Sequence, residues 1–416
     1  MSSRQHKKAT RLLLVVLLCC CLPGWPGLLR ASQPLTAAGL IQQGGYALAG
    51  NGRISAAQNS QTPFIPASTV KIITSLAALE ILGPDHRFAT RIFRDQHNNL
   101  YIKGSGDPFL LTEDVSALVR RLHEAGIREI NNLIVDESAF AIAPRADGNE
   151  NTANPYDAWN GGLAVNFNAI TIRVAPDHSV SSDDPKLPFL PMMQAIGNTL
   201  PPGHYHLNVN AFKAKGQLSN TLRYTGELFT ALMKQEKIRV RGKIMAGETP
   251  AAAAPVLTHW SAKPLREMIR LCLKYSNNFV ANQLFLACGS TRLGAPATWD
   301  KARRALQEYI RDGLGIAAAE LVMIEGSGLS RRNRISADAM ITALQKFAPD
   351  RELLPLKKGL PLKSGTLTGV YCYAGYIPQQ QDAPFVILLN QVQNNRDEIL
   401  ALLMNRQDKR IMTVKK

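Results

Sequence analysis

The chain has 416 residues, of which 45% are hydrophobic and 19% charged, enough apolar material for two or three folded domains. This composition excludes an intrinsically disordered or collagen-like chain, and the length excludes a peptide hormone or a single small module. The formal net charge of +16 suits nucleic acid, an anionic membrane surface or an acidic polymer as a partner.

The first 31 residues have the pattern of an export signal. Residues 1–11 carry four cations and no acid, and an apolar run over 12–22 follows before a Pro-Gly pair. This run is shorter than the roughly 20 residues of a membrane-spanning helix, so we expect a cleaved signal peptide over 1–31. Its removal takes away five cations and no acid, leaving +11. An exported protein meets little nucleic acid, so the charge indicates either attraction to an anionic envelope polymer or a solubility feature.

Three of the six cysteines lie in or next to this apolar run, which leaves Cys272, Cys288 and Cys372 for the mature chain. An odd number excludes a complete disulfide framework. We expect three buried thiols, with one bridge as the alternative in an oxidising compartment.

The predicted elements begin with two strands, 44–51 and 53–60, joined by an Asn-Gly turn. A helical run from Pro66 to Leu82 follows, with proline near its first turn and Gly83 just after its end. Its apolar residues give a wide buried face, so we expect this helix to lie at the centre of the fold.

Residues 86–250 change in character and predict an inserted domain or pair of subdomains. Strands are expected at 87–94, 100–103, 132–136, 170–174 and 204–209, and helices at 113–125 and 227–235. An alanine run at 251–254, followed by Pro255, predicts a linker that returns to the first domain.

The last part of the chain is predicted to be helical over 264–288 and 300–311. Apolar segments with turn signals between them then predict adjacent antiparallel strands, and a final helix follows; these elements are expected at 361–363, 370–377, 384–392 and 397–406. The resulting division is a signal peptide at 1–31, one discontinuous domain at 32–85 and 251–416, and an insert at 86–250.

Three short motifs stand in a characteristic order along the chain. They are Ser68-Thr69-Val70-Lys71 (S-x-x-K), Ser276-Asn277-Asn278 (S-x-N) and Lys363-Ser364-Gly365 (K-[ST]-G). Each alone is weak, because a helix cap, a polar helix break or a strand end gives the same letters. Together and in this order they resemble the motif set of penicillin-binding proteins and class A β-lactamases.

The first motif suits an activated nucleophile. Residues three apart share one face of a helix, so the Lys71 amine can reach the Ser68 hydroxyl as a base. The helix start also favours negative charge developing on Ser68. Lys71 acts as a base only when neutral, and burial and the charge of Lys363 would both lower its pKa.

The other two motifs suit proton transfer and substrate binding. Ser276 and Asn278 would diverge by about 200° on a regular helix, so both face one site only from a break between helices. The Ser276 hydroxyl can then pass a proton between Lys71 and a leaving amine, while the Asn278 amide binds a substrate carbonyl.

Lys363 supplies a cation for a substrate carboxylate, with the hydroxyls of Ser364 and Thr366 beside it. Gly365 lets substrate approach the strand closely. The amides of Ser68 and Thr366 can form an oxyanion hole.

Longer segments resemble peptidase family S13, the serine D-alanyl-D-alanine carboxypeptidases and endopeptidases of the penicillin-binding protein 4 type. They are Pro66 to Leu82, Gly104 to Leu110 (GSGDPFL), Tyr275 to Leu284 (YSNNFVANQL), Glu325 to Ser330 (EGSGLS) and Leu362 to Tyr376 (LKSGTLTGVYCYAGY). That family carries a large insertion between its first two motifs, and 205 positions separate Lys71 from Ser276. The resemblance implies an α/β fold: a β-lactamase/transpeptidase-like sandwich with an antiparallel sheet flanked by helices, plus a large inserted domain.

The resemblance also implies a periplasmic DD-peptidase that acts on peptidoglycan stem peptides through an acyl-enzyme on Ser68, with β-lactams as covalent inhibitors. The predicted catalytic residues are Ser68, Lys71, Ser276 and Asn278, and the predicted substrate-binding residues are Lys363, Ser364, Gly365 and Thr366. No metal, nucleotide cofactor or nucleic acid partner is expected, and membrane association is peripheral at most. Glu325 stands where the family has Asp; the turn after it is as well explained by architecture as by substrate contact, so Ser327 stays outside the predicted site.

Two alternatives remain open: a β-lactamase-like esterase and a non-catalytic cell-wall-binding scaffold. The sequence lacks the E-x-x-L-N pattern that supplies the class A deacylation carboxylate, which favours slow release of penicillin. A scaffold would explain the charge and the insert but gives no reason for the complete motif set. Nucleophile-elbow, H-E-x-x-H, P-loop and G-x-G-x-x-G patterns are also missing, and His204-x-His206 fits one face of a strand better than a metal site.

Overall fold

The structure is a computed structural model that describes residues 36–143, 145–214, 216 and 218–405. The predicted signal peptide at 1–31 and the last residue of the predicted final helix lie outside the described residues. Within these ranges, no helix combines the length and apolar character needed to cross a bilayer.

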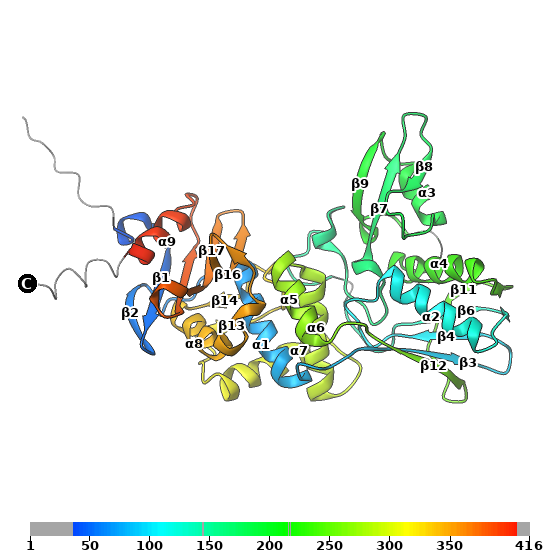
Figure 1. Ribbon diagram of the computed structural model, residues 1–416, viewed down its shortest axis with the longest axis horizontal. Helices are drawn as coiled ribbons and strands as arrows, with labels where there is room; N and C mark the ends of the chain where they lie inside the picture. Colours follow the sequence, from blue (N-terminus) through cyan, green and yellow to red (C-terminus); the bar gives the residue numbers. More distant parts are fainter. Residues whose placement is uncertain (1–35, 144, 215, 217, 406–416) are drawn as a thin grey trace, which may run out of the picture. The chain divides into compact units, whose positions relative to one another are not determined.

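A six-stranded antiparallel sheet joins strands from both ends of the chain (Figure 1). Its strand order is β15 (Leu356–Lys357), β16 (Leu360–Leu367), β17 (Val370–Ile377), β18 (Ala383–Leu389), β1 (Gly44–Gly50) and β2 (Arg53–Gln58). β1 pairs with β18, which places Tyr46 opposite Ile387. The predicted antiparallel strands near the end of the chain are therefore confirmed, and β1 closes onto them although more than 300 residues separate them.

Helices cover both faces of this sheet (Figure 1). Ile387 and Phe385 point to one face and pack with α9 (Arg396–Met404). Val386 and Leu388 point to the other face and belong to a core shared with α1 (Lys71–Leu82) and α8 (Ala337–Phe347). Successive side chains of a strand point to opposite faces, so a sheet between two helical layers buries both sets, as β18 does from Phe385 to Leu389. The predicted α/β sandwich is confirmed.

The remaining elements of this part of the chain lie on both sides of the sheet, most of them around α1. They are η1 (Ala38–Leu40), η2 (Ala67–Val70), α5 (Leu265–Tyr275), α6 (Asn278–Leu293), α7 (Trp299–Glu308), a π-helical turn (Tyr309–Gly313), β13 (Leu321–Val322), β14 (Arg334–Ile335), η7 (Ala348–Leu353) and η8 (Pro378–Gln380). Ile72, Ile73 and Ala77 of α1 are fully buried, so the predicted central position of this helix is confirmed.

Residues between β3 and β12 build a second apolar core. A mixed five-stranded sheet has the order β11 (Ile244–Ala246), β6 (Leu133–Asp136), β4 (Leu100–Lys103), β3 (Ala89–Arg94) and β12 (Ala254–Trp260). The other elements are α2 (Thr112–Glu124), β5 (Glu129–Ile130), η3 (Pro155–Asp157), η4 (Asn166–Asn168), β7 (Ala169–Val174), β8 (Val180–Ser182), α3 (Pro191–Gly197), β9 (Gly203–Asn208), η5 (Val209–Ala211), α4 (Asn220–Gln235) and β10 (Arg239–Val240).

The structure corrects two of the predicted elements and adds elements that were not predicted. The linker prediction is wrong at Ala254 and Pro255, which begin β12 and pair with β3. α4 starts at Asn220, seven residues before the predicted helix, because the Ser219 hydroxyl caps it by accepting from the Leu222 amide. α8 was not predicted. The domain boundaries themselves stay a prediction.

Cys272, Cys288 and Cys372 are buried free thiols, as predicted. Cys272 lies in α5, Cys288 in α6 and Cys372 in β17. Burial raises the pKa of Cys272 to about 11, so this thiol stays protonated at neutral pH although two lysines lie near it.

Candidate active site

The S-x-x-K motif spans the junction of two helices. Ser68 lies in the 3₁₀ turn η2, is partly exposed, and is followed by α1, which begins at Lys71. Ala67, just before the serine, has φ 46°, a left-handed conformation that a residue with a side chain rarely adopts. Backbone strain of this kind is commonly kept at functional sites, where surrounding packing holds it in place.

The Lys71 amine is fully buried at the base of the site and contacts three oxygens. Its Nζ lies 2.9 Å from Ser68 Oγ, 2.8 Å from Asn278 Oδ1 and 2.5 Å from the Ser327 carbonyl oxygen. The amide and carbonyl oxygens can only accept, so they hold two N–H groups of Lys71. The third position faces Ser68 Oγ, which can donate its proton when the amine is neutral.

The surroundings of Lys71 favour the neutral form of its amine. Burial lowers the pKa of Lys71 to about 8, against smaller opposing effects from Cys272 and Glu325. About a tenth of the amine is then neutral at pH 7, which is compatible with a general base that works near neutrality.

The S-x-N motif lies at a helix break, as predicted. Ser276 ends α5 in a left-handed conformation with φ 55°, and Asn277 caps α6 by accepting from the Val280 amide at 3.0 Å. The break turns Ser276 and Asn278 toward the same cleft.

The Asn278 amide is oriented by partners on both sides. Its Oδ1 accepts from Lys71, and its Nδ2 donates to the Tyr156 carbonyl oxygen at 3.2 Å. Tyr156 lies in η3, so the segment predicted as an insert contacts the second motif directly. The sequence carries no signal for this contact, because any residue supplies a backbone carbonyl.

The Lys363 amine joins the third motif to the second. Its side chain is buried, and Nζ donates to Ser276 Oγ at 2.9 Å and to the Ser364 carbonyl oxygen at 2.8 Å. Burial, with the charges of Lys71 and Lys357, lowers the pKa of Lys363 well below its ordinary value. An ammonium has three donors, so one remains for an anionic group of a substrate.

The rest of the K-S-G strand approaches the nucleophile closely. A Cβ on Gly365 would lie 2.7 Å from the Pro66 carbonyl oxygen and 3.0 Å from the Ser68 nitrogen, so only glycine allows β16 to lie this near. Thr366 lines the cleft, and its Oγ1 accepts from Arg396 at 2.9 Å. Ser364 Oγ instead accepts from Lys357 Nζ at 2.7 Å.

The motifs surround a cleft of about 720 Å³, a size that accommodates a small peptide. Ser68, Ser276, Asn278 and Thr366 line it, together with segments 147–150, 156–157, 328–329, 331–332 and 367–368. Ser364, Gly365 and the buried Lys71 and Lys363 are not among the lining residues.

A buried carboxylate shapes the loop that contacts Lys71. Glu325 accepts from the backbone amides of Ser327, Gly328 and Ser330 at 2.8, 2.7 and 3.2 Å. It also accepts from Ser327 Oγ at 2.5 Å and from Asn333 Nδ2 at 2.8 Å. These five bonds fix the turn in which the Ser327 carbonyl meets Lys71, a contact that the sequence analysis missed.

Comparison with known proteins assigns the family. The model of the D-Ala-D-Ala carboxypeptidase 3 (S13) family matches residues 42–362, most of the chain. The chain belongs to the S13 family. This S13 peptidase is therefore a serine-type hydrolase of the D-Ala-D-Ala carboxypeptidase class, as the motifs predicted.

Curated relatives agree with the assignment. The S13 peptidase is 27% identical over 382 residues to a D-alanyl-D-alanine carboxypeptidase of Actinomadura sp. (strain R39), covering 76% of this chain and 71% of the relative. It is 26% identical over 385 residues to a D-alanyl-D-alanine carboxypeptidase of Haemophilus influenzae, covering 78% of this chain and 80% of the relative.

Solved structures share the fold. Penicillin binding protein 4 of H. influenzae superposes with a TM-score of 0.70 at 20% identity, over 86% of this chain and 93% of that one. A predatory peptidoglycan endopeptidase of Bdellovibrio bacteriovorus has a TM-score of 0.50 at 14% identity, over 89% and 92% of the two chains.

Replacing Glu325 with glutamine is expected to disorganise the loop in the S13 peptidase. One oxygen becomes an NH₂ group that faces backbone donors, so the free energy of unfolding should fall by about 3 kcal/mol. The rate of acylation by benzylpenicillin should fall about tenfold to a hundredfold, because the Ser327 carbonyl no longer holds Lys71. Chemical denaturation and acylation kinetics measure the two effects. The control, Glu320→Gln, keeps an oxygen that can accept from Ser336, so it should change neither the free energy of unfolding nor the acylation rate much. Equal effects in both variants would contradict the assigned role.

Proposed function

We propose that this S13 peptidase is a periplasmic DD-peptidase that hydrolyses the D-Ala-D-Ala bond of peptidoglycan stem peptides through an acyl-enzyme on Ser68. The observation that carries the proposal is the buried Lys71 amine, 2.9 Å from Ser68 Oγ and anchored by Asn278 and the Ser327 carbonyl. Further support comes from relatives and neighbours named as D-alanyl-D-alanine carboxypeptidases and a peptidoglycan endopeptidase.

Acylation begins at the Ser68 hydroxyl. Neutral Lys71 takes the proton of Ser68 as Oγ forms a bond to the carbonyl carbon of the penultimate D-alanine. The amides of Ser68 and Thr366, brought close by Gly365, stabilise the negative oxygen of the tetrahedral intermediate. The Asn278 amide, whose Nδ2 keeps one N–H beyond its bond to Tyr156, binds a carbonyl of the substrate backbone.

Collapse of this intermediate breaks the C–N bond and releases D-alanine. Ser276 Oγ accepts from Lys363, so its own proton is available to the leaving nitrogen, and Lys71 returns a proton to Ser276. Water then attacks the acyl-enzyme with Lys71 as the base, and Ser68 regains its proton. The same serine opens the ring of a β-lactam, in line with a neighbouring structure described as a complex with a β-lactam.

The location and the domain organisation are part of the proposal. The basic and apolar pattern of residues 1–31 supports export to the periplasm. We place a transpeptidase-like domain at 32–85 and 251–416, and an insert at 86–250 whose residues 147–150 and 156–157 supply one wall of the cleft.

Two substrates test this function and its main alternatives. The mature protein is incubated with an N-acylated tripeptide ending in D-Ala-D-Ala and with a cross-linked muropeptide dimer, and free D-alanine and monomer are quantified. Release of D-alanine, of monomer or of both supports a DD-peptidase. Hydrolysis of neither, with benzylpenicillin or a simple ester still cleaved, would favour the esterase, and complete inactivity would favour a scaffold.

Lys363→Ala should separate peptide from ester hydrolysis. Removing the cation that meets the substrate's terminal carboxylate should lower kcat/KM for the tripeptide by about a hundredfold. For an ester without that carboxylate, kcat/KM should fall by less than about tenfold. Steady-state kinetics on both substrates measure the difference, with exposed Lys358→Ala as the control. Equal losses on peptide and ester would argue against carboxylate binding by Lys363.

A further inference from the structure

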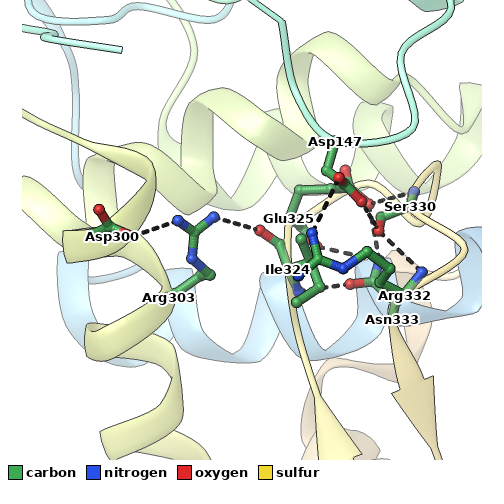
Figure 2. A network of polar contacts seen from close by, with 8 residues as sticks. All are labelled: Asp147, Asp300, Arg303, Ile324, Glu325, Ser330, Arg332 and Asn333. Atoms are coloured by element: carbon green, nitrogen blue, oxygen red, sulfur yellow. Dashed lines mark hydrogen bonds and ion pairs between the residues drawn. The ribbon is translucent and has the colours of Figure 1, made fainter. Parts of the chain in front are cut away.

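A second pocket, here called the arginine pocket, adjoins the catalytic cleft. It has a volume of about 330 Å³ and is lined by Arg145, Asp147, Trp299, Arg303, Ile324 and Arg332. Asp147 and Arg332 also line the catalytic cleft, so the two hollows share one wall. Figure 2 shows this wall, with Arg332 and Ser330 both directed at Asp147.

Positive charge exceeds negative charge in the arginine pocket. Three guanidinium groups line it, with Asp147 as its one lining carboxylate. Arg332 contacts Asp147 at 3.4 Å, and 71% of its side chain is exposed. Arg145 is exposed and has no ion pair with any carboxylate of the described residues. Several N–H donors are therefore available in the planar arrangement that binds carboxylates and phosphates in a bidentate manner.

Hydrogen bonds fix the residues that form the arginine pocket. Arg303 donates to Asp300 and, at 3.3 Å, to the Ile324 carbonyl oxygen, which fixes it between α7 and the following loop (Figure 2). Ser330 Oγ donates to Asp147, and the Ser330 amide donates to Glu325. The loop that orients Lys71 thus also supports the shared wall.

The shape of the arginine pocket favours an anion attached to a larger unit over a free ion. Its volume exceeds that of one carboxylate, and the Trp299 ring offers an apolar surface beside the guanidinium groups. Because it adjoins the cleft at Asp147, a chain that extends from Ser68 past this residue reaches it.

We propose that the arginine pocket binds a carboxylate of the peptidoglycan polymer beyond the peptide held in the catalytic cleft. The proposal rests on the proposed function, since the polymer must enter the cleft for its further groups to reach Arg145 and Arg303. The positive charge of the chain adds long-range attraction to the same anionic polymer. The pocket accordingly favours polymeric over small substrates.

Binding to purified peptidoglycan sacculi tests the arginine pocket without catalysis. The mature protein carries Ser68→Ala so that the polymer is not consumed, and the bound fraction is measured by sedimentation. Arg145→Gln and Arg303→Gln are added singly and together, and Arg304→Gln, an exposed arginine next to Arg303 on α7, is the matched control. Thermal unfolding checks each variant; if Arg303→Gln is not folded, Arg145→Gln alone decides.

Two treatments of the sacculi identify the anion. In one arm the carboxylates are amidated, and in the other hydrofluoric acid removes phosphate-containing polymers. We expect the double variant to bind about tenfold more weakly, the control to stay within about twofold, and amidation to remove the difference between them. Unchanged binding of the variants, an equal loss in Arg304→Gln, or sensitivity to hydrofluoric acid alone would each overturn the proposal.

The kinetic readout separates this proposal from the function on which it rests. With Ser68 intact, Arg145→Gln should keep kcat/KM for the acylated tripeptide within about twofold of the wild-type value. On sacculi, its rate of D-alanine release should fall by about fivefold or more. A wild-type protein that releases no D-alanine from either substrate refutes the proposed function. Cleavage of both substrates with no difference between variant and wild type refutes the arginine pocket alone.

Discussion

Replacing Ser68 with alanine is expected to abolish release of D-alanine from an acylated tripeptide, lowering kcat by at least about a thousandfold. The loss is expected because Ser68 supplies the nucleophile. Among the described residues, no other hydroxyl on the cleft wall contacts the Lys71 amine. The fold should persist, since Ser68 Oγ is partly exposed and has Lys71 as its described hydrogen-bond partner. Release of D-alanine is measured by a coupled assay.

Ser290→Ala is the control for this variant, since it removes a hydroxyl from α6 whose one hydrogen bond within the described part of the chain is to the nearby Ala287 carbonyl. It should retain full activity. Substantial hydrolysis by Ser68→Ala at the wild-type pH optimum would show that the nucleophile lies elsewhere.

Replacing Lys71 with arginine is expected to be nearly as severe, with acylation reduced by at least about a thousandfold at every pH. A guanidinium has a pKa above about 12 and cannot accept the Ser68 proton in the accessible range. In the wild-type protein, burial lowers the pKa of Lys71 to about 8. The base is the neutral form, so the acylation rate should fall about tenfold for each pH unit below 8 and level off above it.

The rate of acylation by benzylpenicillin between pH 5.5 and 9.5 checks this dependence, with Lys274→Arg on the exposed side of α5 as the matched control. The control should keep the wild-type profile. A flat wild-type profile across pH 7 to 9, or an active Lys71→Arg variant, would contradict the assignment of Lys71 as the base.

The sequence indicated most of the geometry of the candidate site because side-chain chemistry at fixed spacing is visible in the sequence. The three-residue spacing of Ser68 and Lys71 predicted that their side chains meet, as they do. The two-residue spacing of Ser276 and Asn278 predicted a break between helices, which the structure contains. Gly365 was foreseen as a point of close approach, and its backbone does lie against Ser68.

Contacts made by the backbone could not be predicted in this way. The Ser327 and Tyr156 carbonyl oxygens hold Lys71 and Asn278, yet any residue supplies a carbonyl. Glu325 offered a partial signal, since an acid before a Gly-Ser-Gly turn can accept from the turn's amides, but its burial depends on tertiary packing.

The fold shows the same limit. Apolar segments and turn signals gave the bounds of β17 to the residue and located β18, which ends three residues before the predicted end, because local pattern decides such strands. The alanine run before Pro255 looked like a linker, but pairing with β3, about 160 residues earlier in the chain, makes Ala254 and Pro255 part of a strand. Long-range pairing overrides a weak local preference, as it commonly does for strands.

The most direct test of the acyl-enzyme is the intact mass of the mature protein after minutes and after hours with benzylpenicillin, followed by mapping of the modified peptide. We expect a lasting one-to-one adduct on Ser68, formed quickly and released slowly. No adduct at either time, with the penicillin intact, or an adduct mapped to any other residue, would contradict it.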